Sequence, residues 1–320
     1  MFEKMIEKLK ANPRKVVFPE GEDSRILHAA SRLKQEAILE PLLLGNPSDV
    51  AAVAKDANIN IDGIEIINPK SYEKLDEMVM VMFELRKGKM TEKECREALQ
   101  KTNYFGTMLV KMGIADGLLG GATYSTADTV RPALQIIKTK PGNSIVSSCF
   151  IMDRPGERYA MADCAINLFP TADELVEIAV ETAGMARLFG IDPKVAMLSY
   201  SSLGSGKGPE VDKIREATEK LKAMQLDFPV DGELQFDAAF VPEVGKTKAP
   251  NSKVAGEANV FIFPDINAGN IGYKIAQRLG NFEAIGPILM GINAPINDLS
   301  RGTNAEEVYK MAIITAAAAE

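Results

Sequence analysis

The sequence predicts an α/β protein with two domains. Short apolar segments typical of buried strands alternate with segments of helical periodicity almost throughout the chain. The 320 residues are enough for two sizeable cores, and 46% apolar and 25% charged residues are ordinary for a globular protein. A turn at 141–143, Pro-Gly-Asn, is the expected boundary, and the final helix is expected to return to the first domain. The predicted domains are 1–143 with 298–320, and 144–297.

Four short apolar segments in the first domain are predicted strands, with helices between them. Asp23 or Ser24 can cap the helix that runs to about Gln35, and Thr91 with Glu94 has the capping-box pattern. The expected strands span 15–18, 39–44, 64–67 and 115–121, and a further helix is expected over 126–137.

The second domain begins with a predicted pair of strands over 144–152 and 158–166. Thr171 and Glu174 form another capping box, which opens a long helix to Phe189. The elements expected next are a strand over 195–200, a helix over 209–224, a strand over 259–263, a helix over 269–279 and a strand over 285–292. The segment 242–256 is expected to be a solvated loop.

Charge and cysteine usage exclude several classes of protein. The net charge of −7 argues against general nucleic-acid binding, which depends on neutralising phosphates. Cys95, Cys149 and Cys164 are odd in number and lack a CxxC spacing. They favour a reducing, cytoplasmic compartment over disulfides or a cysteine zinc site. Neither a signal-peptide core nor a membrane helix, which needs roughly 18 uncharged apolar residues, is expected.

His28 is the single histidine, and it lies in a helical pattern. A lone helix histidine is more often a packing or surface residue than a catalyst. A Ser-His-Asp triad and a histidine-rich metal site are therefore not expected, and any acid–base chemistry should fall to a carboxylate or a lysine.

The segment 291–302 is the first candidate for a functional loop. We expect 285–292 to be a buried parallel strand, followed by a loop that ends in Ser300-Arg301-Gly302 just before a helix. Ligands of open α/β sheets bind at the carboxyl ends of strands, and helix N-termini favour anions. An ordinary turn with a surface arginine is the alternative interpretation.

Three more loops join a predicted strand to a predicted helix. The loop 199–209, which contains Ser205, is rich in glycine and hydroxyl groups but matches neither a Walker A loop nor GxGxxG. The loop 120–132 has two glycines, then Ser125 and Thr126, which either bind a ligand or cap the helix. Arg131 opposes the dipole of that helix, which is better explained by a bound anion. The loop 263–274 is polar, and plain turns remain the alternative for all three.

Eight short motifs are distributed over the whole chain. They are Phe18-Pro19-Glu20-Gly21, Tyr104-Phe105-Gly106, Leu109–Gly113, Ser125-Thr126-Ala127, Arg131–Gln135, Phe263-Pro264-Asp265, Asn270–Lys274 and Asn297–Gly302. Taken together, these motifs resemble the phosphate acetyltransferase (phosphotransacetylase) family. The resemblance implies reversible transfer of acetyl between CoA and phosphate. It also implies two three-layer α/β domains around a deep cleft that holds the active site, similar to isocitrate and isopropylmalate dehydrogenases, and a homodimer.

Site residues follow from the resemblance, position by position. The family's catalytic serine and arginine correspond to Ser300 and Arg301, and its catalytic aspartate to Glu307. Glu307 in place of aspartate is one departure from the family's pattern. Thr303, where the family commonly has cysteine, is a second. The expected CoA- and phosphate-binding residues are Arg131, Arg86, Arg25, Ser125, Thr126, Ser205 and Lys274.

Local chemistry bears on the substituted carboxylate. Thr303 and Glu306 fit a capping box, which leaves Glu307 available to the cleft as a base. In the expected mechanism phosphate attacks the thioester carbonyl, Ser300 donates a hydrogen bond to the oxyanion and Arg301 binds phosphate. A Ser–Lys pair stays open as another way to activate the serine. The resemblance implies CoA, acetyl-CoA, phosphate and acetyl phosphate as ligands, with no bound cofactor or metal.

Three alternatives remain. The first is phosphate butyryl transfer. The second is an NAD-linked decarboxylating dehydrogenase on the similar fold, although no paired carboxylate metal cluster is recognised in the sequence. The third is a non-catalytic acyl-CoA or acetyl-phosphate binding protein, suggested by the departure at Glu307.

Overall fold

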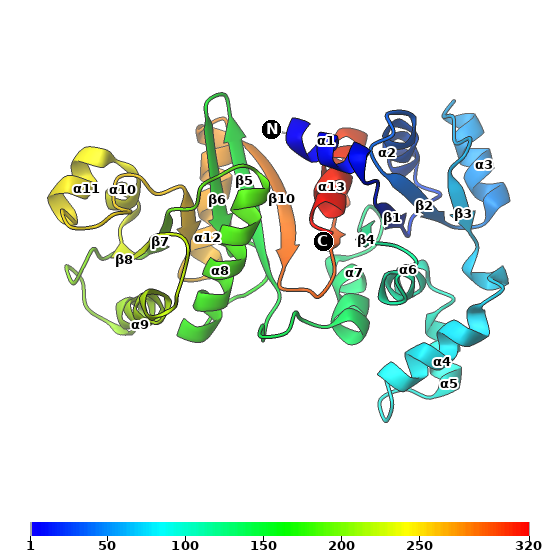
Figure 1. Cartoon of the computed structure of the whole chain (residues 1–320), viewed down its shortest axis with the longest axis horizontal. Coiled ribbons are helices and arrows are strands. Elements are labelled where there is room, and N and C mark those ends of the chain that lie inside the picture. The colour runs from blue at the N-terminus through cyan, green and yellow to red at the C-terminus, as the bar shows by residue number, and fades with distance from the viewer. Residues whose placement is uncertain (1, 320) are drawn as a thin grey trace. The chain divides into compact units, whose positions relative to one another are not determined.

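The computed structural model describes residues 2–319, which divide into two compact units. One consists of Met1–Pro141 with Ile292–Glu320, and the other of Gly142–Gly291. Each unit has its own β-sheet (Figure 1). The α/β class predicted from the alternation of strands and helices is therefore confirmed.

The first unit is built on a five-stranded parallel sheet in the order β11-β4-β1-β2-β3. Its central strands are buried on both faces, as their uninterrupted apolar sequences require. The strand order reverses beside β1, and ligand crevices form at the carboxyl ends of strands at such a reversal. The strands are β1 (Lys15–Phe18), β2 (Glu40–Leu44), β3 (Glu65–Ile67), β4 (Gly117–Gly120) and β11 (Ile296–Asp298).

Helices cover both faces of this sheet (Figure 1). Helices α2 and α13 pack together on one face, and α6 and α7 pack together on the other. The helices are α1 (Glu3–Ala11), α2 (Ser24–Gln35), α3 (Pro47–Asp56), α4 (Leu75–Leu85), α5 (Glu92–Ala98), α6 (Thr102–Lys111), α7 (Thr126–Pro132) and α13 (Ala305–Ala317), with short turns η1 (Pro69–Ser71) and η2 (Ala133–Ile137).

The second unit has a six-stranded mixed sheet in the order β10-β5-β6-β9-β7-β8. Strand β5 runs antiparallel to both of its neighbours, β10 and β6, whereas β6, β9, β7 and β8 run parallel to one another. The strands are β5 (Ser147–Arg154), β6 (Glu157–Ala162), β7 (Val195–Leu198), β8 (Val230–Leu234), β9 (Val260–Ile262) and β10 (Glu283–Met290). The helices are α8 (Ala172–Leu188), α9 (Pro209–Ala223), α10 (Phe236–Phe240), α11 (Pro242–Lys248) and α12 (Ile266–Leu279).

Three capping predictions and one strand pairing that depend on local sequence are confirmed. Asp23 caps α2, and the capping boxes at Thr91 and Thr171 are both present. The predicted strand pair is the antiparallel pair β5 and β6. By contrast, the segment 242–256 is not simply a loop, because α11 begins there with Pro242 in its first turn.

The strand predicted before the Ser300 loop is wrong in two respects. β10 is antiparallel to β5 and lies at the edge of the second unit's sheet. The pairing register shifts between Ile285 and Ile288, where Gly286 and Pro287 interrupt the ladder, and proline is tolerated at such an edge. The parallel strand that leads to Ser300 is instead β11, which is only three residues long.

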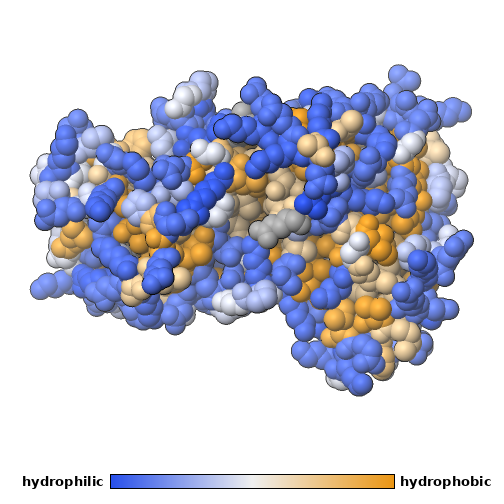
Figure 2. Space-filling model, viewed as in Figure 1, coloured by the Kyte–Doolittle hydropathy of each residue, from blue (hydrophilic) through white to orange (hydrophobic). Residues whose placement is uncertain are grey.

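The surface of the molecule is mixed in polarity. The face drawn in Figure 2 is mostly hydrophilic, with apolar residues in small patches between charged ones. Within residues 2–319, no helix has the length and apolar content needed to cross a membrane.

Candidate active site in the first unit

The candidate site lies at the carboxyl edge of the first unit's sheet. Strands β1, β4 and β11 are parallel neighbours, so the loops that follow them lie at the same edge. The Leu299 amide donates to the Gly120 carbonyl at 2.7 Å, which joins the loop after β11 to the loop after β4. Ser300 and Arg301 follow immediately and are exposed.

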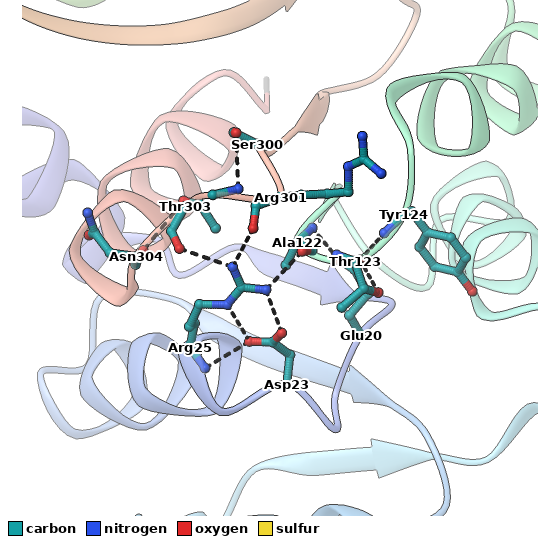
Figure 3. Close-up of polar contacts among 11 residues, drawn as sticks. Glu20, Asp23, Arg25, Ala122, Thr123, Tyr124, Ser300, Arg301, Thr303 and Asn304 are labelled. Atoms are coloured by element: carbon teal, nitrogen blue, oxygen red, sulfur yellow. Dashed lines mark hydrogen bonds and ion pairs between the residues drawn. The ribbon is translucent and has the colours of Figure 1, made fainter.

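Glu20 organises the loop after β4 (Figure 3). Its buried carboxylate accepts hydrogen bonds from the amides of Ala122, Thr123 and Tyr124 at 2.9, 2.5 and 2.8 Å, and from the Thr123 hydroxyl at 2.8 Å. The amides of this loop, a candidate for ligand binding in the sequence, are therefore occupied by an internal carboxylate. This role of Glu20 was not predicted from the sequence, although the residue follows β1 by two positions in one of the motifs that carry the family resemblance.

Gly121 permits the close approach of the two loops. Its φ is +101°, and a Cβ there would lie 2.3 Å from the Asp298 Oδ1 atom and 2.7 Å from the Leu299 amide nitrogen. No other residue fits this position without moving the chain that leads to Ser300.

Asp298 is a buried carboxyl group at the end of β11. Burial raises its pKa, hydrogen bonds from the side chains of Thr126 and Thr129 lower it, and the nearby charge of Glu20 raises it, with a net increase. Oδ1 is buried without a hydrogen-bond partner among the described residues. Asp298 therefore ties the start of α7 to the base of the Ser300 loop, a contact that the sequence analysis missed.

The two hydroxyls predicted at the start of α7 have different positions. Ser125 is the N-cap: its Oγ accepts from the Asp128 amide at 3.2 Å and lies 2.7 Å from Asp128 Oδ2, which accepts its proton. This is the capping alternative left open by the sequence. Thr126 is the first helical residue and bonds to Asp298.

The Ser300-Arg301-Gly302 turn exposes two functional groups (Figure 3). Ser300 Oγ accepts from the Gly302 amide at 3.2 Å, so its own proton remains available to a ligand. The Arg301 side chain extends away from Arg25, and no described residue forms a hydrogen bond or ion pair with its guanidinium. A hydroxyl donor and an unpaired cation thus stand on consecutive residues of one exposed turn.

Arg25, which the resemblance implies as a CoA-binding residue, has all of its hydrogen-bond partners within the first unit. Its guanidinium contacts Asp23 and the carbonyls of Ala122, Arg301 and Thr303 (Figure 3). These partners are all within the protein, so the structure does not present Arg25 as an open CoA-binding group.

The capping prediction for the last helix is wrong by one residue. α13 begins at Ala305, and Asn304 is its N-cap, with its Oδ1 accepting from the Glu307 amide at 2.9 Å. Asparagine is as good a cap as threonine, so the sequence allowed both registers. Glu306 forms an ion pair with Arg32 at 2.8 Å instead of closing a capping box.

Glu307 lies on the exposed first turn of α13. Its Oε2 accepts a hydrogen bond from the Thr303 hydroxyl at 2.9 Å, which fixes the orientation of the carboxylate. The side chains of Thr303 and Glu307 are therefore bonded to each other.

Arg86 and Arg131 lie near one phenol, that of Tyr104. Burial raises the pKa of Tyr104, whereas the charges of Arg131 and Arg86 lower it. Tyr104 donates to Gln135 Oε1 at 2.9 Å, and Arg86 donates to the Gln135 carbonyl at 3.3 Å. The Arg86 Nε is buried without a partner among residues 2–319, and Arg131 is exposed. The two arginines thus form a basic cluster around Tyr104, and a cluster of this kind suits a polyanion.

Ser205 and Lys274 belong to the second unit. The Ser205 loop has internal partners for its amides: Gly204 donates to Glu233, Gly206 to Ser201 and Ser202 to Ser205. Buried Glu233 thus fills this loop much as Glu20 fills the loop after β4. Lys274 is exposed on α12. No grouping of three or more potential metal ligands occurs among the described residues of either unit.

Comparison with known proteins identifies the family. A family model described as "Phosphate acetyl/butaryl transferase" matches residues 1–316. A Bacillus subtilis protein named phosphate acetyltransferase is 54% identical over 319 residues, covering 100% of this chain and 99% of its own length. A Streptococcus pyogenes phosphotransacetylase structure matches with TM-score 0.97 and 58% identity, covering 99% of this chain and 97% of its own. The Staphylococcus aureus EutD phosphotransacetylase matches with TM-score 0.95 and 51% identity over the same shares. The chain therefore belongs to the phosphate acetyl/butyryl transferase family.

Proposed function

We propose that the chain catalyses reversible acetyl transfer between CoA and inorganic phosphate, so that acetyl-CoA and phosphate give acetyl phosphate and CoA. The observation that carries this proposal is the exposed Ser300-Arg301 pair, with a free hydroxyl proton and an unpaired guanidinium. Acetyl is favoured over butyryl because the full-length relative at 54% identity is named for acetyl transfer. The alternative of an NAD-linked dehydrogenase is rejected, because the chain belongs to the phosphate acetyl/butyryl transferase family.

Arg301 and Ser300 divide the work at the reacting centre. The Arg301 guanidinium binds a phosphate oxyanion, with two parallel N–H···O bonds when both nitrogens reach it. A phosphate oxygen attacks the thioester carbonyl carbon, and the Ser300 hydroxyl donates to the oxygen on which negative charge develops. The C–S bond then breaks, and CoA leaves as the thiolate.

Glu307 acts in the reverse direction. Its carboxylate takes the proton of the CoA thiol, whose unperturbed pKa is about 8.5. The thiolate attacks the carbonyl carbon of acetyl phosphate, and the C–O bond to phosphate breaks. The Thr303 hydrogen bond to Oε2 leaves Oε1 to accept the proton. CoA is a substrate, and neither a bound cofactor nor a metal enters this mechanism.

The Arg86–Arg131 cluster binds the phosphates of CoA. Arg131→Ala should raise the KM for CoA by roughly 10–100-fold, because one charge-assisted hydrogen bond contributes about 1.5–3 kcal/mol. The KM for phosphate should change little. Arg96→Ala is the matched control, since Arg96 is an exposed arginine of the same unit that pairs with Asp76. An unchanged CoA KM in the Arg131 variant would defeat the assignment.

A homodimer is proposed through the exposed apolar side of α12. Ile271, Ile275 and Leu279 are 57%, 53% and 80% exposed and recur every four residues, on one side of the helix. An apolar stripe of this kind on a polar surface marks an interaction site.

The three buried free cysteines support a reducing, cytoplasmic location.

Replacing this stripe tests the dimer. In light scattering, the wild type should have the mass of two chains and the Ile275→Lys/Leu279→Lys variant the mass of one. Leu203→Lys, at a residue 49% exposed elsewhere in the second unit, should leave the mass unchanged. A monomeric wild type would refute the proposal.

The acyl specificity is tested by comparing phosphate-dependent CoA release from acetyl-CoA and butyryl-CoA. We expect a higher kcat/KM with acetyl-CoA. The opposite order would establish butyryl transfer, and no release from either would favour a binding protein.

A further inference from the structure

Arg25 uses every hydrogen-bond donor of its side chain within the protein. A guanidinium has five N–H groups. Nε donates to Asp23 Oδ1 at 3.0 Å, and Nη2 donates to Asp23 Oδ2 at 2.7 Å and to the Ala122 carbonyl at 2.8 Å. Nη1 donates to the carbonyls of Arg301 at 2.9 Å and Thr303 at 3.1 Å. No donor is left for a phosphate of CoA.

The positive charge of Arg25 is also balanced by the carboxylate of Asp23. Asp23 caps α2 and meets the guanidinium through both carboxylate oxygens. Burial raises the pKa of Asp23, but hydrogen bonds and charge from Arg25 outweigh burial and lower it overall. The pair therefore has little net charge to attract a polyanion.

The carbonyls that Arg25 contacts belong to the two loops of the candidate site. Ala122 is in the loop whose amides bind Glu20, and Arg301 and Thr303 lie on either side of Gly302. Two further hydrogen bonds close the turn, and both are accepted by Ser300. The Thr303 amide donates to the Ser300 carbonyl, and the Gly302 amide donates to Ser300 Oγ. Arg25 thus connects the loops after β1, β4 and β11 at one point.

We propose that Arg25 is a positioning residue that holds the Ser300–Arg301 turn against the loop after β4, and that it does not contact CoA. The inference rests on the proposed acetyl transfer. Arg25 therefore acts through Arg301. It fixes the Arg301 backbone by a hydrogen bond to the carbonyl and does not contact the Arg301 guanidinium. Lysine cannot replace it, because an ammonium has three donors and no planar fork.

Arg25→Lys separates positioning from CoA binding. A displacement of about 1 Å at a reacting group costs on the order of 10² in rate, so we expect kcat to fall by about that factor. The KM for acetyl phosphate should rise, because Arg301 is displaced. The Kd for CoA, measured by calorimetry, should stay within fivefold of the wild-type value.

Two results would overturn the proposal: a CoA Kd weakened by fivefold or more, or a kcat within fivefold of wild type. Asp23→Asn is a second, milder variant for the case that Arg25→Lys does not fold. It weakens the hydrogen bonds between Asp23 and the Arg25 guanidinium, and Asp23 carries no positive charge that could bind CoA. It should show the same separation of kcat from CoA Kd. Wild-type protein that forms no thioester would instead reject the proposed function.

Discussion

Glu307→Gln should lower kcat for acetyl-CoA formation by roughly 10²–10⁴-fold, the usual contribution of a positioned general base. Glutamine keeps the size of the side chain and can still accept the Thr303 hydrogen bond, which is 2.9 Å long. It cannot take the proton of the CoA thiol. The CoA affinity should change little, because Glu307 acts on the thiol and not on the phosphates. Initial rates at saturating CoA and acetyl phosphate measure the effect.

Two neighbouring variants serve as controls. Glu307→Asp should keep much of the activity, because aspartate retains a carboxylate that can take the proton and is the residue that the family resemblance implies here. Glu306→Gln removes only an ion pair between Arg32 and Glu306, whose side chains are 46% and 56% exposed, and such surface pairs contribute about 0–1 kcal/mol. An inactive Glu306 variant beside an active Glu307 variant would reverse the assignment of the two carboxylates.

Ser300→Ala should lower kcat by roughly 10²–10³-fold, as expected for one oxyanion donor. The variant should fold, because Ser300 is exposed. The Gly302 amide, which donates a hydrogen bond to Ser300 Oγ in the wild type, can donate to water instead. Ser48→Ala removes another exposed hydroxyl at the start of a helix and should leave the rate unchanged.

The alternative for Ser300 is covalent catalysis. In that case the alanine variant would be inactive, and mass spectrometry would detect an acetyl group on Ser300 of the wild type after rapid quenching. The proposed mechanism has no such intermediate, so an acetylated Ser300 would contradict it.

Local sequence was sufficient for most elements of the fold. The caps at Asp23, Thr91 and Thr171 depend on a side chain and an amide no more than three residues apart, so their spacing reveals them. The register of α13 was missed because Thr303 and Asn304 are both good caps, and tertiary contacts decide between them. β11 was missed because its three residues, Ile296–Asp298, include only one apolar side chain, so no apolar segment marks the strand.

Contacts over long separations were not predictable from composition. Their glycines and hydroxyl groups made loops 120–132 and 199–209 candidates for ligand binding, yet Glu20 fills the first from 102–104 residues away and Glu233 fills the second from 29–32 residues away. The role of Arg25 depends on acceptors 276 and 278 residues distant. The sequence identifies which groups are present, but the parallel order of β1, β4 and β11 decides which of them meet.

The most direct test of acetyl transfer is thioester absorbance after CoA and acetyl phosphate are mixed with the wild-type chain. The account predicts a rise in absorbance that requires both substrates, reverses when excess phosphate is added, and is lost in Arg301→Ala. No rise with the folded wild-type protein, or an undiminished rise with Arg301→Ala, would contradict it.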